Sequence, residues 1–330
     1  MTKIQKSQRH KRHKGIRDIA ASERGIALLL VLWVLTILMV IVFSFSYMAR
    51  TESHATLVFK EGMEKKFLAE AGIERGIMEL FYRNQFFSVE GSEIWKIDGT
   101  PYTVQMGDGY YTIRIMDEAG HVNINSVSDI ILKNLLLNVG VQAEEVDTIV
   151  DSIMDWKDPD DLHRLHGAES DYYMSLPIPY KAKNANFDTL EELLLVKGIK
   201  PEILYGSGEK KGIIDFLTVN SMSSQINVNA AAKEVLMTIP GMTPEIADGI
   251  ITYRQSKEIM GVQEIQGILG GSYISMAPYI ITGGTTTYTI ESVGYKGSGK
   301  AGYAIKATVI LETNNKFRYV YYKSPSHITQ

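Results

Sequence analysis

The sequence predicts an α+β protein in which a long N-terminal helix packs on an antiparallel sheet, with a large α-helical domain inserted into that sheet. Three observations support this fold class. An uncharged apolar run near the N-terminus continues into a charged segment with helical periodicity. Strand-like segments occur before and after a mainly helical middle. The 330 residues, 45% of them apolar, are enough for one large domain or two ordinary ones.

Residues 1–25 form a basic leader, and residues 26–45 form a candidate membrane anchor. The leader contains eight Lys/Arg and two Asp/Glu, a local charge of +6 in a chain whose net charge is −4. The anchor, IALLLVLWVLTILMVIVFSF, has no charge and as a helix would cross about 30 Å of hydrocarbon. Since basic residues favour the cytoplasmic side, we expect a single-pass protein with a cytoplasmic N-terminus.

The helix is expected to continue through residues 46–83. This stretch lacks Pro, and apolar residues recur every three or four positions from Phe59 to Phe81, the pattern of an amphipathic helix. A coiled coil is the alternative interpretation. Three glycines within residues 62–76 argue against a long, stable heptad seam.

The predicted sheet is built from residues 84–123 and 281–325, which flank an inserted helical domain at residues 124–280. The segments EIWKIDG, PYTVQMGDG and YYTIRIMDEAG are rich in β-branched and aromatic residues, with turns expected at Asp98-Gly99 and Asp108-Gly109. The segments TTTYTIESVGYKG, AGYAIKATVILET and KFRYVYYKS predict three further strands. Domain insertion requires adjacent entry and exit points, which hairpin tips provide.

Seven carboxylates lie within residues 151–171 of the helical middle: Asp151, Asp155, Asp158, Asp160, Asp161, Glu169 and Asp171. Like charges repel, so this clustering lowers stability unless a cation compensates it. Oxygen ligands suit Ca²⁺, although the residues alone favour a solvated acidic loop with Asp at a helix cap. His163 and His166 leave Zn²⁺ open as a further alternative.

Several function classes are excluded or not indicated. The chain has no Cys, which excludes disulfides, thiolate zinc sites and thiol catalysis. No Ser/His/Asp set, H-E-x-x-H, P-loop or G-x-G-x-x-G is present, so no enzymatic activity is predicted.

Two helix-hairpin-helix-like units are expected at about residues 187–204 and 226–255. In the second, Asn229 would cap the first helix and Pro240-Gly241 would form the hairpin. Such hairpins can hold DNA phosphates through backbone N–H groups. Residues 221–270, however, contain five Asp/Glu and three Lys/Arg, and Glu245 stands where a phosphate would dock. No nucleic-acid partner is therefore expected.

The order of basic leader, Gly25 and apolar helix resembles the type IV prepilin class. In that class a prepilin peptidase cuts after the Gly, so the mature chain would begin at Ile26. The fifth mature position, usually Glu, is Leu30 in this sequence. The alternative is an anchor that is never processed.

The acidic segment carries a more specific resemblance. It is similar to the general secretion pathway protein K family, minor pseudopilins of the type II secretion system, in the spacing of Asp155-Trp156, Asp158, Asp160-Asp161, Gly167-Ala168-Glu169, Tyr172-Tyr173 and residues 187–193.

This resemblance implies a pilin-like fold and a bacterial inner-membrane protein with a periplasmic head. The implied function is that of a tip subunit that helps to initiate and cap the pseudopilus used for protein export. The implied partners are other minor pseudopilins, the major pseudopilin, prepilin peptidase and inner-membrane lipid. The resemblance also implies calcium, with Asp158, Asp160 and Glu169 preferred as ligands and Asp155 and Asp161 as second choices. A membrane-anchored, competence-like DNA-binding protein is the alternative function.

Overall fold

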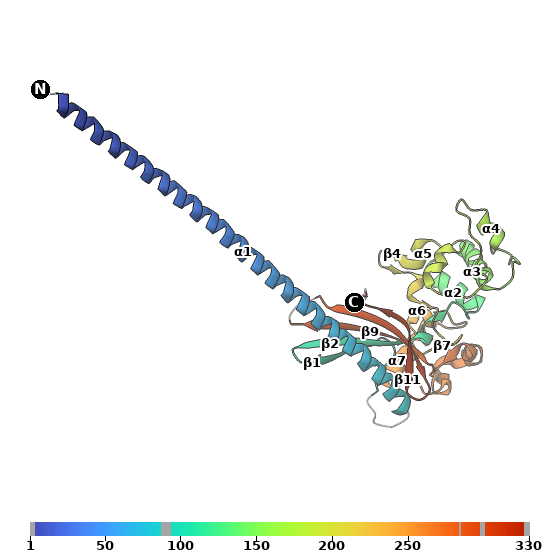
Figure 1. The fold of residues 1–330 in the computed structure, drawn as a ribbon. Coiled ribbons are helices and arrows are strands. Elements are labelled where there is room, and N and C mark those ends of the chain that lie inside the picture. The colour runs from blue at the N-terminus through green and yellow to red at the C-terminus, as the bar shows by residue number, and fades with distance from the viewer. Residues whose placement is uncertain (1–3, 87–93, 284, 298–300, 327–330) are drawn as a thin grey trace. The chain divides into compact units, whose positions relative to one another are not determined.

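The computed structural model describes residues 4–86, 94–283, 285–297 and 301–326, with side chains from Ile26 onward. The chain divides into two compact units, Met1–Met63 and Glu64–Gln330. Helix α1 (Ile4–Phe86) makes up the first unit and continues into the second (Figure 1). It extends three residues beyond the predicted end of the helix at residue 83.

The first unit presents an apolar helix. Within the described residues, one helix, Ile26–Gln85, is long and apolar enough to cross a membrane, and its apolar window is not buried by protein. Trp33 and Phe45, for example, are 69% and 74% exposed. Such exposure is unfavourable in water and fits a single-pass anchor whose side chains face lipid or neighbouring helices.

The second unit contains a five-stranded antiparallel sheet with the order β1-β2-β9-β10-β11. Its strands are β1 (Tyr102–Met106), β2 (Gly109–Asp117), β9 (Thr287–Lys296), β10 (Tyr303–Glu312) and β11 (Lys316–Lys323). The first two strands precede the helical segment and the other three follow it, and β2 pairs directly with β9. The chain thus leaves and re-enters the sheet on neighbouring strands, which confirms the predicted α+β fold class.

Two local predictions for the sheet were wrong. Within the segment EIWKIDG, the described residues 94–99 form no strand and contribute only the bridge between Asp98 and Met116. Pro101, which follows closely, has no N–H with which to extend a ladder. The first hairpin turns at Gly107 and Asp108, one residue earlier than expected, because Met106 pairs with Gly109 and Gly107 adopts φ +63°.

The second part of α1 packs on this sheet through a stripe of buried residues, Ala69, Ile73, Ile77 and Leu80. They share one core with buried strand residues that include Ile113, Ile115, Ile290 and Val309. Spacings of three and four place the stripe on one face of the helix. The approach is close at Gly294 of β9, where a Cβ atom would lie 2.1 Å from the Lys65 carbonyl oxygen. A side chain there would push the helix away from the sheet.

The segment between β2 and β9 forms a second hydrophobic core of its own, which contains Leu132, Ile149, Leu236 and Ile250. Its helices are α2 (Asp129–Asn138), α3 (Ala143–Lys157), α4 (Ser170–Met174), α5 (Pro201–Tyr205), α6 (Lys233–Leu236), α7 (Pro244–Ser256), α8 (Gln266–Leu269) and α9 (Tyr273–Met276). Three short strand pairs complete it: β3 (Val122–Asn123) with β6 (Leu217–Thr218), β4 (Gly206–Ser207) with β5 (Lys210–Lys211), and β7 (Ile226–Asn227) with β8 (Ile280–Ile281).

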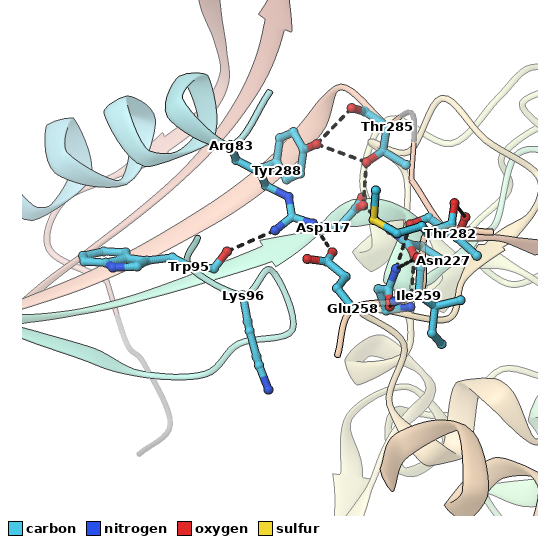
Figure 2. A network of polar contacts seen from close by, with 12 residues as sticks. Arg83, Trp95, Lys96, Asp117, Asn227, Glu258, Ile259, Thr282, Thr285 and Tyr288 are labelled. Carbon is cyan, nitrogen blue, oxygen red and sulfur yellow. Dashed lines mark hydrogen bonds and ion pairs between the residues drawn. The ribbon is translucent and has the colours of Figure 1, made fainter. Parts of the chain in front are cut away.

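A polar network joins the end of α1 and the sheet to this helical segment (Figure 2). Arg83 forms an ion pair with Glu258. Asp117, buried at the end of β2, accepts hydrogen bonds from Asn227 Nδ2 at 2.7 Å and Thr285 Oγ1 at 2.5 Å. Burial outweighs these bonds and raises the pKa of Asp117. Each contact joins residues more than 100 positions apart in the sequence and ties the helical segment to the sheet.

Candidate metal site

Three carboxylates from two short stretches of chain meet beside the C-terminal end of α3. Asp155 lies in the last turn of α3, Asp158 directly follows the helix, and Glu169 directly precedes α4. One oxygen atom from each lies within 4.8 Å of the other two. Asp155 and Glu169 are 0% and 1% exposed, and Asp158 is half-buried. Three negative charges that are this close together and largely shielded from solvent require a cation or protons to neutralise them.

Several oxygens of this cluster accept no hydrogen bond from the part of the chain that the structure describes. Both Glu169 carboxylate oxygens and Asp158 Oδ1 are buried and accept no hydrogen bond from the described residues. Asp155, in contrast, accepts hydrogen bonds from the Arg164 backbone N–H at 3.2 and 3.3 Å. A buried carboxylate oxygen without a hydrogen bond is costly, and three of them in a cluster of close carboxylates suit a hard cation.

The electrostatics of the cluster agree with this geometry. Burial, with the neighbouring Asp155 and Asp158 charges, raises the pKa of Glu169 to about 7. Burial also raises the pKa of Asp155 and of Asp158. A bound divalent cation would favour the ionised forms and lower all three pKa values.

The loop between α3 and α4 is held in place by the acidic face of α3. Asp151 Oδ2 accepts a hydrogen bond from the His166 backbone N–H at 3.0 Å, one helical turn before the contact of Asp155 with Arg164. Gly167 lies so close that a Cβ atom there would be 1.8 Å from Asp155 Oδ2. Any side chain at this position would displace the Asp155 carboxylate and so disturb the cluster.

An aromatic cluster packs behind the carboxylates. The Trp156 ring lies 5.1 Å from the Tyr173 ring, edge to face, and 6.5 Å from the Phe187 ring, nearly parallel. All three side chains are buried. This apolar wall lowers the local dielectric and strengthens the interaction between the carboxylates and any cation.

The structure separates the five predicted ligands into two groups. Asp155, Asp158 and Glu169 come together, whereas Asp160 and Asp161 are exposed and outside the cluster. Asp160 Oδ1 accepts the Leu162 backbone N–H at 2.8 Å, which closes a local turn.

The structure does not support the zinc alternative, because no described histidine belongs to the carboxylate cluster. His163 Nε2 lies 2.9 Å from Asp171 Oδ1 on the exposed side of the loop. Among the residues that the structure describes, the one candidate metal cluster contains only carboxylates. The donor set is thus all oxygen, which is typical of calcium and atypical of zinc.

The predicted processing and assembly residues all lie within α1. Gly25 and Ile26 are internal to the helix, and Leu30 is 61% exposed. Cleavage after Gly25 stays a prediction.

The second predicted helix-hairpin-helix unit, at residues 226–255, is formed by α6 and α7 around Gly241, which adopts φ +86°. The expected cap was wrong: Ala232 precedes α6, and Asn229 Nδ2 instead donates to the Ile259 and Thr282 carbonyl oxygens. Its amide satisfies buried backbone groups, which outweighs its preference for a helix cap.

The N-terminus of α7 is poorly suited to phosphate. Thr243 Oγ1 already accepts the Ile246 N–H, and Glu245 occupies the first turn. Lys233, the basic residue of α6, pairs with Asp248. Nothing in this geometry favours DNA binding.

Comparison with known proteins gives two matching family models. Residues 115–205 match that of type II secretion system (T2SS), protein K, and residues 221–270 match that of the helix-hairpin-helix motif.

Two relatives are both named type II secretion system protein K. The protein of Pectobacterium carotovorum subsp. carotovorum is 25% identical over 201 residues, which cover 55% of this chain and 60% of the relative. The protein of Pseudomonas aeruginosa is 27% identical over 172 residues, which cover 49% of each chain. The chain thus spans about half to three fifths of the length of the curated relatives it matches. These matches confirm the resemblance to the protein K family.

A solved structure shares the fold. One chain of the crystal structure of the GspK-GspI-GspJ complex from the enterotoxigenic Escherichia coli type 2 secretion system matches with a TM-score of 0.60. The match covers 84% of this chain and 100% of that chain at 13% sequence identity.

Proposed function

Because the chain resembles type II secretion system protein K in sequence and fold, we propose that it is a minor pseudopilin. It is a membrane-anchored structural subunit that helps to initiate and cap the periplasmic pseudopilus used for protein export. The observation that carries this proposal is the architecture itself. An exposed apolar helix extends into a segment that packs on a sheet, and a protein K-like helical segment is inserted between two strands of that sheet.

The position at the tip is supported by Leu30. In pilin-like filaments, a Glu at the fifth mature position is thought to pair with the terminal amine of a neighbouring subunit. A buried carboxylate without such a partner would be costly. Leu30 carries no carboxylate, so it requires no partner. A subunit with no neighbour above it needs no carboxylate at this position.

The proposed partners are other minor pseudopilins, the major pseudopilin, prepilin peptidase and inner-membrane lipid. The solved relative was crystallised as a complex of GspK, GspI and GspJ, which supports the first of these. The basic leader supports a cytoplasmic N-terminus and a periplasmic head.

The proposal is tested by the intact mass of the full-length protein from cells with and without prepilin peptidase. We expect loss of residues 1–25 only when the peptidase is present, and co-purification of the processed protein with other minor pseudopilins of the same organism. An uncut chain that captures none of them would overturn the proposal.

We further propose that Asp155, Asp158 and Glu169 hold a calcium ion. The ion would neutralise the three carboxylates and fix the loop between α3 and α4 against α3, a structural role. Support comes from the unpartnered Glu169 and Asp158 oxygens and from the all-oxygen donor set.

Isothermal titration of the metal-free protein with CaCl₂ should show binding that Asp158→Ala/Glu169→Ala abolishes. The exposed Glu191→Gln serves as a control and should bind as wild type does. Absence of heat and of any thermal shift with wild type would reject the site.

A further inference from the structure

A groove separates the second part of α1 from strand β11. It has a volume of about 520 Å³ and is open to solvent. Its lining residues are Glu70, Ile73 and Glu74 of α1 and Tyr319 and Tyr322 of β11. We call it the α1–β11 groove.

The aromatic wall of the groove depends on a β-bulge. Val309 of β10 pairs with Tyr319, but Ala307 pairs with Tyr322, because β11 contains one extra residue between these pairs. Ala307 and Val309 are both buried on the face that packs against α1. The extra residue therefore turns Tyr322 toward the helix, where a regular strand would place Tyr321.

The two rings remain accessible. Tyr319 and Tyr322 are 38% and 46% exposed, with ring centroids 5.5 Å apart and nearly perpendicular planes. Strand β11 is also an edge of the sheet, since β10 is its only partner among the described strands. Exposed aromatic residues on an unpaired edge strand are typical of an interaction surface.

The opposite wall is acidic. Glu70 and Glu74 lie one helical turn apart, and the Tyr319 hydroxyl donates to Glu74 Oε1 at 3.2 Å. Lys66 Nζ lies 3.6 Å from Glu70 Oε1, but both groups are more than one third exposed, so this pair is weak. Burial and the Glu74 charge raise the pKa of Tyr319 to about 12, as expected in a negative environment.

Carboxylates beside accessible aromatic rings are suited to a cationic side chain, which pairs with the carboxylates and lies against the rings. We propose that the α1–β11 groove receives a lysine or arginine side chain from the head of a neighbouring pilin-like subunit. This inference rests on the proposed function and names one of its contact surfaces. The groove lies within the head, between β11 and the part of α1 that packs on the sheet. The same charge disfavours anionic lipid head groups and nucleic acid.

The first test measures the affinity of the full-length protein in detergent for each purified pilin-like subunit of the same organism. Glu70→Gln/Glu74→Gln should weaken binding of at least one subunit about ten-fold, and salt should weaken wild-type binding more than that of the variant. The control Glu202→Gln/Glu209→Gln changes net charge equally at exposed sites of the helical segment and should bind as wild type does.

The second test uses the absence of Cys from the chain. Tyr322→Cys, labelled with a benzophenone maleimide, should cross-link under illumination to a peptide of the partner that contains Lys or Arg. Tyr205→Cys, a 50% exposed tyrosine of the helical segment, is the matched control and should not cross-link.

The inference would be overturned if Glu70→Gln/Glu74→Gln bound its partners as tightly as wild type does. It would also be overturned if Tyr322→Cys cross-linked only to peptides without basic residues. Either result would leave the proposed function intact. Wild type that binds none of the subunits would overturn both.

Discussion

Whether Glu169→Gln or wild type has the more stable head should depend on calcium. Without metal, the Glu169 carboxylate is buried beside Asp155 and Asp158 with no hydrogen-bond donor from the described residues. A Gln at this position is neutral and can donate its amide N–H to those carboxylates. The metal-free variant should therefore be more stable than metal-free wild type.

The magnitude follows from the pKa of Glu169, which the fold raises from 4.5 to about 7. Because the folded protein binds the proton more tightly than the unfolded chain, metal-free wild type loses stability as the pH rises from about 4.5 to 7, and the loss then levels off. At pH 8 the loss amounts to about 3 kcal/mol, and at pH 5 to less than about 1 kcal/mol. The variant should lack this pH dependence.

Calcium acts in the opposite direction. At 100 times its Kd it should stabilise wild type by about 2.7 kcal/mol, which nearly cancels the advantage of the variant. At 1,000 times its Kd the stabilisation is about 4.1 kcal/mol, so wild type should then be the more stable protein.

The assay is unfolding followed by tryptophan fluorescence at pH 5 and pH 8, with chelator or with increasing CaCl₂. Trp156 is buried next to Asp155 and reports on this region. Glu191→Gln controls for the loss of one exposed charge. The reasoning is refuted if wild type and Glu169→Gln keep the same order of stability at every calcium concentration, or if their difference in chelator is the same at both pH values.

Three further predictions concern the loop, the junction and the anchor. Gly167→Ala forces a Cβ atom against Asp155 and should abolish the calcium-dependent shift in Tm, measured by thermal unfolding; an undiminished shift would show that the loop tolerates the methyl group. Arg83→Met removes the partner of Glu258 and should lower the free energy of unfolding by about 1–3 kcal/mol, measured in urea, with hydrogen exchange increasing near Glu258; unchanged exchange there would contradict a fastening role. Leu30→Glu should leave the head folded by circular dichroism but allow subunits to stack above it, so that filaments seen by electron microscopy change in length or number; unaltered filaments would argue against the tip position.

Much of the fold follows from local sequence patterns. The uncharged run from residue 26, the three- and four-residue periodicity beyond it and the strand segments at both ends depend on neighbours in the chain, and they are sufficient for the α+β class. The predicted helix cap at Asn229 failed because distant partners intervened. Asn229 satisfies Ile259 and Thr282, 30 and 53 positions away, and so does not cap its own helix.

The candidate sites show the same limit. Composition identifies a cluster of carboxylates along the chain, but it cannot show which of them meet in the fold. Asp160 closes its own turn, whereas the loop around Gly167 brings Glu169 back to the end of α3. The α1–β11 groove has no sequence signature, because it depends on a bulge that changes which tyrosine faces the helix. The sequence by itself determined the anchor, the periodic elements and the acidic segment, since these depend on spacing along the chain. Only the tertiary structure decided which carboxylates meet and which rings border them, because burial and pairing bring together residues that the chain keeps apart.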